Sequence, residues 1–194
     1  MWYNLRFRIL GCMAFMMIVL SSCSKDDDGD GFVGDSNLPK ASYAFFIKGD
    51  NSEALGGMNI KGKIYNTILF ADKDIRDAYK WGPSTKLTTY ALDLISESQY
   101  DVNNIPTGEF EVGTDCRFYF AINSSYDSEG ETQGYLEKGS ILKVKKNGSK
   151  YDFTISGEAR LYYNEDISTL TDPQPFSFHY EGKIIDNGFT EDDF

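Results

Sequence analysis

The chain from residue 43 onward consists mostly of short runs in which apolar and polar side chains alternate. In the run FSFHYE, residues 176–181, three aromatic side chains alternate with serine, histidine and glutamate. A β-strand places successive side chains on opposite faces of its sheet, so this spacing gives one apolar face and one polar face. Similar runs predict strands over 43–48, 58–64, 67–71, 87–95, 108–112, 116–122, 141–155 and 158–163.

About eight to ten such strands predict an all-β domain, either an antiparallel up-and-down β-barrel or a β-sandwich. Within 141–155, the pair Asn147-Gly148 is typical of a type I′ hairpin turn. A helical pattern is scarce. It is best in residues 72–81, where Ile75 and Tyr79 are four apart and Gly82 precedes a proline, so one short helix is expected there.

The first 22 residues have a different character. Arg6 and Arg8 precede the continuous apolar run 9–20, which has 12 residues. A bilayer-spanning helix needs roughly 20 residues, whereas this length suits the apolar part of a secretory signal. The run ends in Leu-Ser-Ser-Cys, with Cys23 in the last position.

This ending resembles the lipobox of bacterial lipoproteins. The resemblance implies that the chain is cut before Cys23 and that fatty acyl chains, palmitate among them, are attached to this residue. Two or more acyl chains give stable anchoring to a bilayer. An ordinary secreted protein, or an uncleaved membrane anchor, is the alternative.

The residues after Cys23 are rich in acid: Ser24, Lys25, Asp26, Asp27 and Asp28. This sequence is similar to the export signal of Bacteroidota surface lipoproteins, which implies the outer membrane, with the domain facing the cell exterior. A lipoprotein of the periplasmic face with an acidic linker is the alternative.

The acidic stretch also resembles the start of an EF-hand loop, but position twelve of that loop is Asn37 instead of an acid. No metal site is therefore predicted there. The chain divides into a signal peptide at 1–22, an acylated cysteine with a flexible acidic tether at 23–40, and a single β domain at 41–194.

The domain itself is similar, in the order of its elements, to lipocalin-like domains of Bacteroidota lipoproteins. The similarity lies in the segment PTGEFEVG, the Asn147-Gly148 hairpin and the final run FSFHYEGKI. It favours a barrel, and the β-sandwich remains the alternative.

Charge excludes one class of partner. Loss of the two arginines in residues 1–22 takes the formal charge from −11 to −13. Nucleic-acid binding needs lysine and arginine to replace released counterions, so no nucleic-acid partner is expected. Cys116 is the one cysteine left in the domain, which therefore has no internal disulfide.

No catalytic residue, cofactor or metal site is predicted, and we expect a protein that is not an enzyme. His179 is the single histidine, expected to be a solvent-facing or rim residue on the polar side of the last strand, and no Gly-x-Ser-x-Gly motif accompanies it. Paired carboxylates keep a glycoside hydrolase open as an alternative, because that chemistry needs two acids across a cleft. The candidate acids are Glu109, Glu111, Glu158 and Glu181.

Aromatic residues in loops are the candidates for ligand contact. Trp81, Tyr79 and Tyr126 lie among polar residues, and flat rings beside polar groups suit stacking on sugars. The sequence thus predicts a non-catalytic binding module for a glycan, a small apolar ligand or an outer-membrane partner protein, anchored to the bilayer through Cys23. A structural or assembly lipoprotein is a further alternative.

Overall fold

The computed structural model describes residues 39–47, 62–124, 132–163 and 170–186. Nine strands form one antiparallel sheet, and one short 3₁₀ helix, η1, covers Ile75–Lys80. The all-β prediction is confirmed, as is the short helix within 72–81. Cys23, residues 24–28 and Tyr126 lie outside the described residues. The strands are β1 (Tyr43–Ile47), β2 (Ile64–Ala71), β3 (Leu87–Ser96), β4 (Gly108–Glu111), β5 (Cys116–Ser124), β6 (Thr132–Leu136), β7 (Ile141–Asn147), β8 (Lys150–Tyr163) and β9 (Gln174–Gly182).

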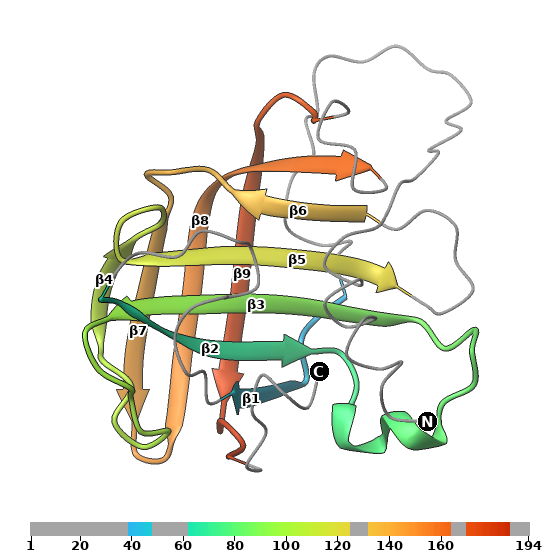
Figure 1. Cartoon of the computed structure of the whole chain (residues 1–194), viewed down its shortest axis with the longest axis horizontal. Helices are drawn as coiled ribbons and strands as arrows, with labels where there is room; N and C mark the ends of the chain where they lie inside the picture. Colours follow the sequence, from blue (N-terminus) through green and yellow to red (C-terminus); the bar gives the residue numbers. More distant parts are fainter. Residues whose placement is uncertain (1–38, 48–61, 125–131, 164–169, 187–194) are drawn as a thin grey trace.

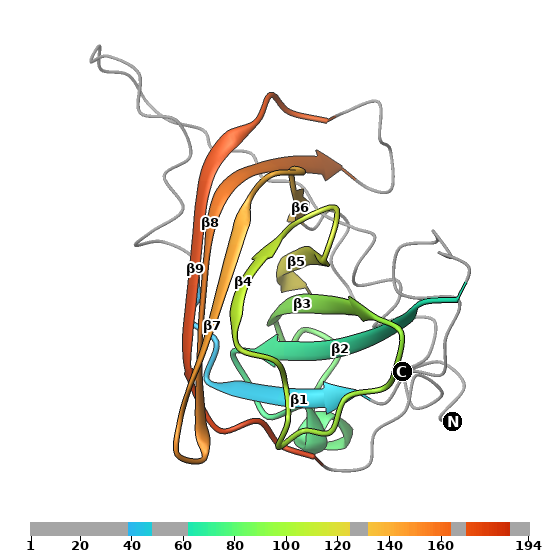
Figure 2. The same ribbon diagram turned by 90° about the vertical axis from the view of Figure 1, so that its left-hand side faces the viewer.

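The strand order is β1-β2-β3-β5-β6-β8-β7-β4, with β9 on the other edge of β8. The 14-residue strand β8 has three partners: its first half pairs with β7 and β9, and its last residues pair with β6. Strands β1, β2, β3, β5 and β6 run across the molecule, while β4, β7 and β9 run along a different direction (Figure 1). Figure 2 shows the result, a sheet folded into two layers with β8 shared between them.

Aromatic rings fill the space between the layers. The Phe178 ring of β9 lies 5.0 Å from Phe70, 4.7 Å from Tyr90 and 5.2 Å from Phe118, measured between ring centroids. These tilted contacts join one layer to the other and add to the gain from burying the rings themselves. The alternation in the sequence therefore packs one continuous core, which also takes in Leu92, Phe153 and Ile155.

A second, smaller cluster lies on the opposite face of the first strands. Phe45, Leu69 and Leu87 are buried there together with Ile75 of η1. The helix begins at Asp74, whose side chain accepts a 3.1 Å hydrogen bond from the Arg76 amide. Both faces of β1–β3 are thus apolar, which explains why β2 and β3 contain nearly continuous buried runs.

The sheet does not close into a barrel by strand pairing. In the described chain β9 pairs only with β8, and β1 pairs as a strand only with β2. Ile185, just after β9, makes an isolated parallel bridge to Phe45, with backbone hydrogen bonds of 2.9 and 2.8 Å. We call the gap between β9 and the start of β1 the β9–β1 seam.

Strand β6 was not predicted from the sequence. Residues 58–61 of the predicted strand 58–64 lie outside the described residues, and β2 covers Ile64–Ala71 without the predicted break. Two further local features differ from the sequence-based prediction. Strand β8 runs unbroken from Lys150 to Tyr163, where two strands were predicted. The predicted hairpin is present, but Asn147 pairs with Lys150, so its two turn residues are Gly148 and Ser149. Gly148 has a φ of +61°, whereas Asn147 does not have a positive φ. A positive φ at the first turn residue alone is the pattern of a type II′ turn instead of type I′.

Candidate functional site

A cavity of about 370 Å³ opens at the β9–β1 seam. This volume is within the range of small-molecule sites. Four elements supply its walls: the segment that leads into β1, strand β3, and the neighbouring strands β8 and β9. The lining residues are Pro39, Lys40, Ala41, Tyr90, Thr154, Ser177, Phe178 and His179.

The inner wall of the cavity is aromatic. Tyr90 and Phe178 are both nearly inaccessible and belong to the core, so the cavity reaches down to the core surface. The Tyr90 hydroxyl donates a hydrogen bond of 2.7 Å to the Pro39 carbonyl oxygen. Burial, and secondarily the charge of Asp72, raise the pKa of Tyr90, so this hydroxyl remains a protonated donor at physiological pH.

The outer wall is polar. Thr154 of β8 lies directly opposite His179 of β9 in the strand register. Asp152 accepts a 3.2 Å hydrogen bond from the Thr154 hydroxyl, and the same carboxylate oxygen lies 3.2 Å from His179 Nε2. The His179 side chain is 59% exposed, which agrees with the prediction of a surface or rim position. It faces water instead of a closed site that would shield a catalytic base.

The chain has 30 acidic residues, but the ionisable side chains that the structure describes in the cavity wall are not acidic. Within the part of the chain that the structure describes, Lys40 and His179 line the cavity together with Tyr90, and no carboxylate does. Asp152 contacts the lining residues His179 and Thr154 without lining the cavity itself. Among the described residues, no group of three or more histidine, cysteine or acidic side chains could hold a metal ion.

The loop aromatics predicted for ligand contact lie elsewhere. Trp81 packs against the second apolar cluster, where its backbone amide caps η1 with a 3.0 Å bond to Ala78. Tyr79 is 75% exposed, and the Lys80 ammonium lies 5.1 Å from the centre of its ring. Neither residue lines the seam cavity, and their part in binding stays a prediction.

Two of the acids considered for hydrolysis, and two further acids of the helical segment, are in ion pairs. Glu109 lies 2.8 Å from Lys143 across the β4–β7 pair, and this hydrogen bond lowers the pKa of Glu109. Glu181 lies 3.9 Å from Lys150. In the helical segment, Asp74 binds Arg76 at 2.6 Å, and Asp77 binds Lys80 at 2.6 Å. None of these carboxylates lines the seam cavity.

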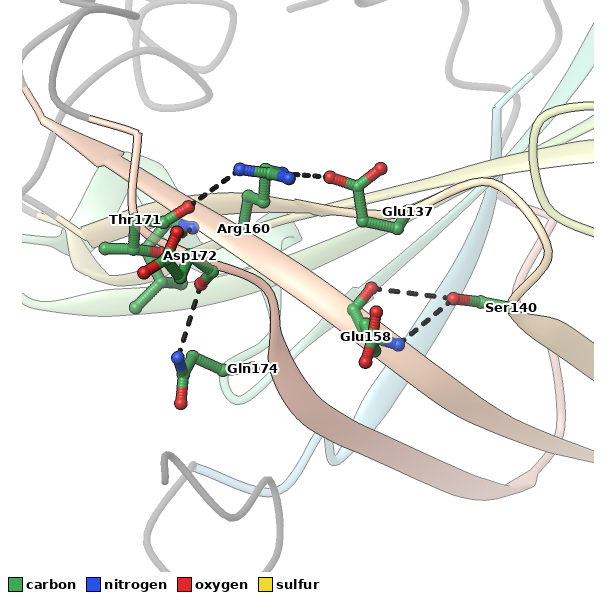
Figure 3. A network of polar contacts seen from close by, with 8 residues as sticks. Glu137, Ser140, Glu158, Arg160, Thr171, Asp172 and Gln174 are labelled. Carbon is green, nitrogen blue, oxygen red and sulfur yellow. Dashed lines mark hydrogen bonds and ion pairs between the residues drawn. The ribbon is translucent and has the colours of Figure 1, made fainter. Parts of the chain in front are cut away.

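A polar network fastens the segment that leads into β9 (Figure 3). Arg160 of β8 pairs with Glu137 and donates a 3.1 Å hydrogen bond to the Thr171 carbonyl oxygen. Thr171 also exchanges bonds with Leu161: its amide donates at 2.9 Å, and its hydroxyl accepts at 3.1 Å. The network positions the chain three residues before β9 and so helps to place one wall of the seam.

A second contact in the same network explains a glycine inside β8. Ser140 Oγ accepts a 3.3 Å hydrogen bond from the Glu158 amide. A Cβ on Gly157 would lie 1.9 Å from Ser140 Oγ and 2.8 Å from Ser140 Cα. Glycine is therefore required there, because the backbone of the β6–β7 connection passes too close for any side chain.

The sequence predicted none of the cavity residues as ligand contacts, and His179 was singled out only as a solvent-facing or rim residue. The other lining residues come from four separate segments. The alternation of apolar and polar residues indicates on which side of a strand a residue lies, but not which strands are neighbours in the sheet. Pro39 and Lys40, just before the first strand, were assigned to the tether. Nothing in the sequence near these two residues indicates the contact of Pro39 with Tyr90.

Comparison with protein-family models, with curated proteins and with solved structures finds no match to this chain. The helical part of the described chain offers no segment with the length and hydrophobicity that a bilayer crossing requires.

Proposed function

We propose that this chain is an outer-membrane-anchored, surface-exposed lipoprotein whose β domain binds a small ligand, without catalysis, at the β9–β1 seam. The observation that carries the binding proposal is the cavity of about 370 Å³ between Pro39–Ala41 and β9. Elsewhere between the layers, interlocked aromatic rings occupy the core. The ligand therefore enters at the seam instead of along an axis through the fold.

The composition of the cavity favours a ligand with an apolar part. Phe178, Pro39 and Ala41 present carbon atoms, and Lys40 and Thr154 place polar groups at the mouth. Small-molecule sites commonly combine an apolar lining with a few polar groups that orient the ligand. Of the predicted ligand classes, this arrangement supports a small partly apolar molecule more than a glycan, whose stacking aromatics were expected at Trp81 and Tyr79.

Anchoring is supported by the sequence at the other end of the tether. The Leu-Ser-Ser-Cys ending at Cys23 and the acidic residues 24–28 resemble lipidation and surface-export signals. A flexible coil of 17 residues, the length from Ser24 to Lys40, would span about 20–25 Å, enough to hold the domain clear of lipid headgroups. Because Pro39 and Lys40 are both tether residues and cavity residues, the binding site lies at the end of the domain where the tether attaches.

Binding is tested with the mature chain from residue 23, carrying Cys23→Ser so that it stays unacylated. The probe is hexan-1-ol, followed by NMR chemical-shift titration. Thr154→Trp, at an exposed position in the cavity wall, is expected to weaken binding about tenfold or more by filling the mouth, because it displaces apolar contact. Thr114→Trp, an exposed threonine that does not line the cavity, is the matched control. Equal affinity in the two variants would contradict the proposed site.

Anchoring is tested by feeding cells an alkyne-tagged palmitate. Labelling and membrane fractionation are expected to be lost in Cys23→Ser and kept in Cys12→Ser, since Cys12 lies within the signal. Replacing Asp26, Asp27 and Asp28 by alanine should keep the label but remove accessibility to protease added outside intact cells. A Cys23→Ser chain that is still labelled and membrane-bound would refute the anchor.

A further inference from the structure

We infer that the seam cavity selects small organic anions, namely carboxylates with a short apolar part, over neutral or cationic molecules of the same size. This inference rests on the proposed function, because it assigns the ligand class of the same cavity. The reason is the distribution of charge around the cavity within a strongly acidic chain.

The described cavity wall differs in the sign of its charge from the chain as a whole. The full sequence has 30 acidic against 19 basic residues, whereas the eight described residues that line the cavity include Lys40 and His179 and no carboxylate. A cationic ligand would find no counter-charge in that wall. A carboxylate would find the Lys40 ammonium, which has three hydrogen-bond donors and is exposed at the mouth.

The preference for anions comes from Lys40 and not from His179. His179 Nε2 lies 3.2 Å from an Asp152 carboxylate oxygen, so any positive charge on the imidazole is already opposed by a neighbouring negative charge. The Asp152 carboxylate also accepts a hydrogen bond from Thr154, and Asp152 is not itself a lining residue of the cavity. The negative charge of Asp152 nevertheless remains close to the rim and works against an anion there.

The aromatic inner wall and the polar outer wall of the cavity determine the orientation that we expect for the bound ligand. The apolar part of the ligand contacts Phe178, Ala41 and Pro39, and its carboxylate stays at the mouth beside Lys40. An ion pair that remains in contact with water is weak, so the preference is modest. We expect hexanoate to bind about two- to fivefold more tightly than hexan-1-ol, and hexylamine more weakly than either.

The test compares these three ligands, which share one apolar chain, by NMR titration of the unacylated mature chain at low salt. Lys40→Gln should abolish the preference for hexanoate, and Asp152→Asn should increase it. Lys138→Gln, an exposed lysine that does not line the cavity, removes the same net charge and should leave the preference unchanged. Added salt should weaken hexanoate binding and leave hexan-1-ol binding constant.

The outcomes separate the two proposals. A wild-type chain that binds all three ligands equally, or a preference that survives in Lys40→Gln, overturns the anion selection while the binding site stands. A loss of preference in Lys138→Gln as large as in Lys40→Gln shows a general charge effect and also overturns it. If none of the three ligands binds, the proposed binding function fails, and the anion inference fails with it.

Discussion

The Tyr90 hydroxyl and the Pro39 carbonyl oxygen form a 2.7 Å hydrogen bond between residues 51 positions apart. The bond joins the middle of β3 to the segment that precedes β1, and both residues line the seam cavity. It therefore holds one wall of the cavity in place. Without it, Pro39 would be attached to the domain chiefly through the residues that follow it.

Tyr90→Phe tests the strength of this link. The variant keeps the ring contacts with Phe178 and Phe118 but leaves the Pro39 carbonyl without its donor, so the free energy of unfolding should fall by about 1 kcal/mol. Urea denaturation measures the change. Tyr79→Phe, at an exposed ring outside the core, should have no measurable effect, and equal stabilities for the two variants would contradict the role assigned to Tyr90.

Gly157→Ala tests the close approach between β8 and the β6–β7 connection. The added methyl group would overlap Ser140, and a rigid backbone contact at 2.8 Å cannot be relieved by a side-chain rotation. We expect a loss of about 2–3 kcal/mol or more. Gly82→Ala is the control, because nothing lies within 4 Å of the added atom and its φ is not positive. Ser140→Gly in the same chain should restore part of the loss, and a neutral Gly157→Ala would refute the contact.

Arg160→Ala tests the network of Figure 3. The substitution removes the ion pair with Glu137 and the 3.1 Å bond to the Thr171 carbonyl, and the expected loss of stability is about 1–2 kcal/mol. Lys143→Ala, which breaks the more exposed pair with Glu109, should cost about 0.5 kcal/mol or less.

Hydrogen exchange gives a local measurement of the same change. The Leu161 amide, which donates to the Thr171 hydroxyl, should exchange faster in Arg160→Ala and at the wild-type rate in Lys143→Ala. Unchanged exchange at Leu161 in both variants would mean that Arg160 does not hold the segment before β9.

Cys116 reports on global unfolding. Burial, assisted by the charges of Asp115 and Asp93, raises the pKa of this thiol to about 12, so at pH 8 almost none of the reactive thiolate is present. In the unacylated mature chain with Cys23→Ser, the thiol should react with Ellman's reagent at least about a hundredfold more slowly than after denaturation in urea. Rapid reaction of the native chain would show that the core around Cys116 opens easily.

The all-β class and most strand positions followed from alternation, because a strand with one buried face must repeat every two residues. Strand β6 did not, and Gly134 is the reason. Glycine gives no periodic signal, and it is needed there because a Cβ would lie 2.4 Å from Phe120 Cζ. Gly157 explains why β8 was predicted as two strands. In the sequence, a glycine that permits close packing inside a strand resembles the end of a strand.

The cavity could not be predicted from periodicity alone. Its walls depend on which strands become neighbours, and β8 and β9 meet β3 only after the sheet has folded over. Tyr90 has the same alternation as the other core residues of β3, so its hydroxyl bond to Pro39 is visible only in three dimensions. His179 was identifiable because it is the single histidine and lies on the polar side of its strand.

The three partner strands of β8 also determine how early the sheet can form while the protein is being synthesised. Strands β6, β7 and β9 all depend on residues 150–163, so neither layer is complete until the last quarter of the chain has left the ribosome. The emerging polypeptide therefore cannot complete its sheet during most of its synthesis, a delay that the export proposed above would require.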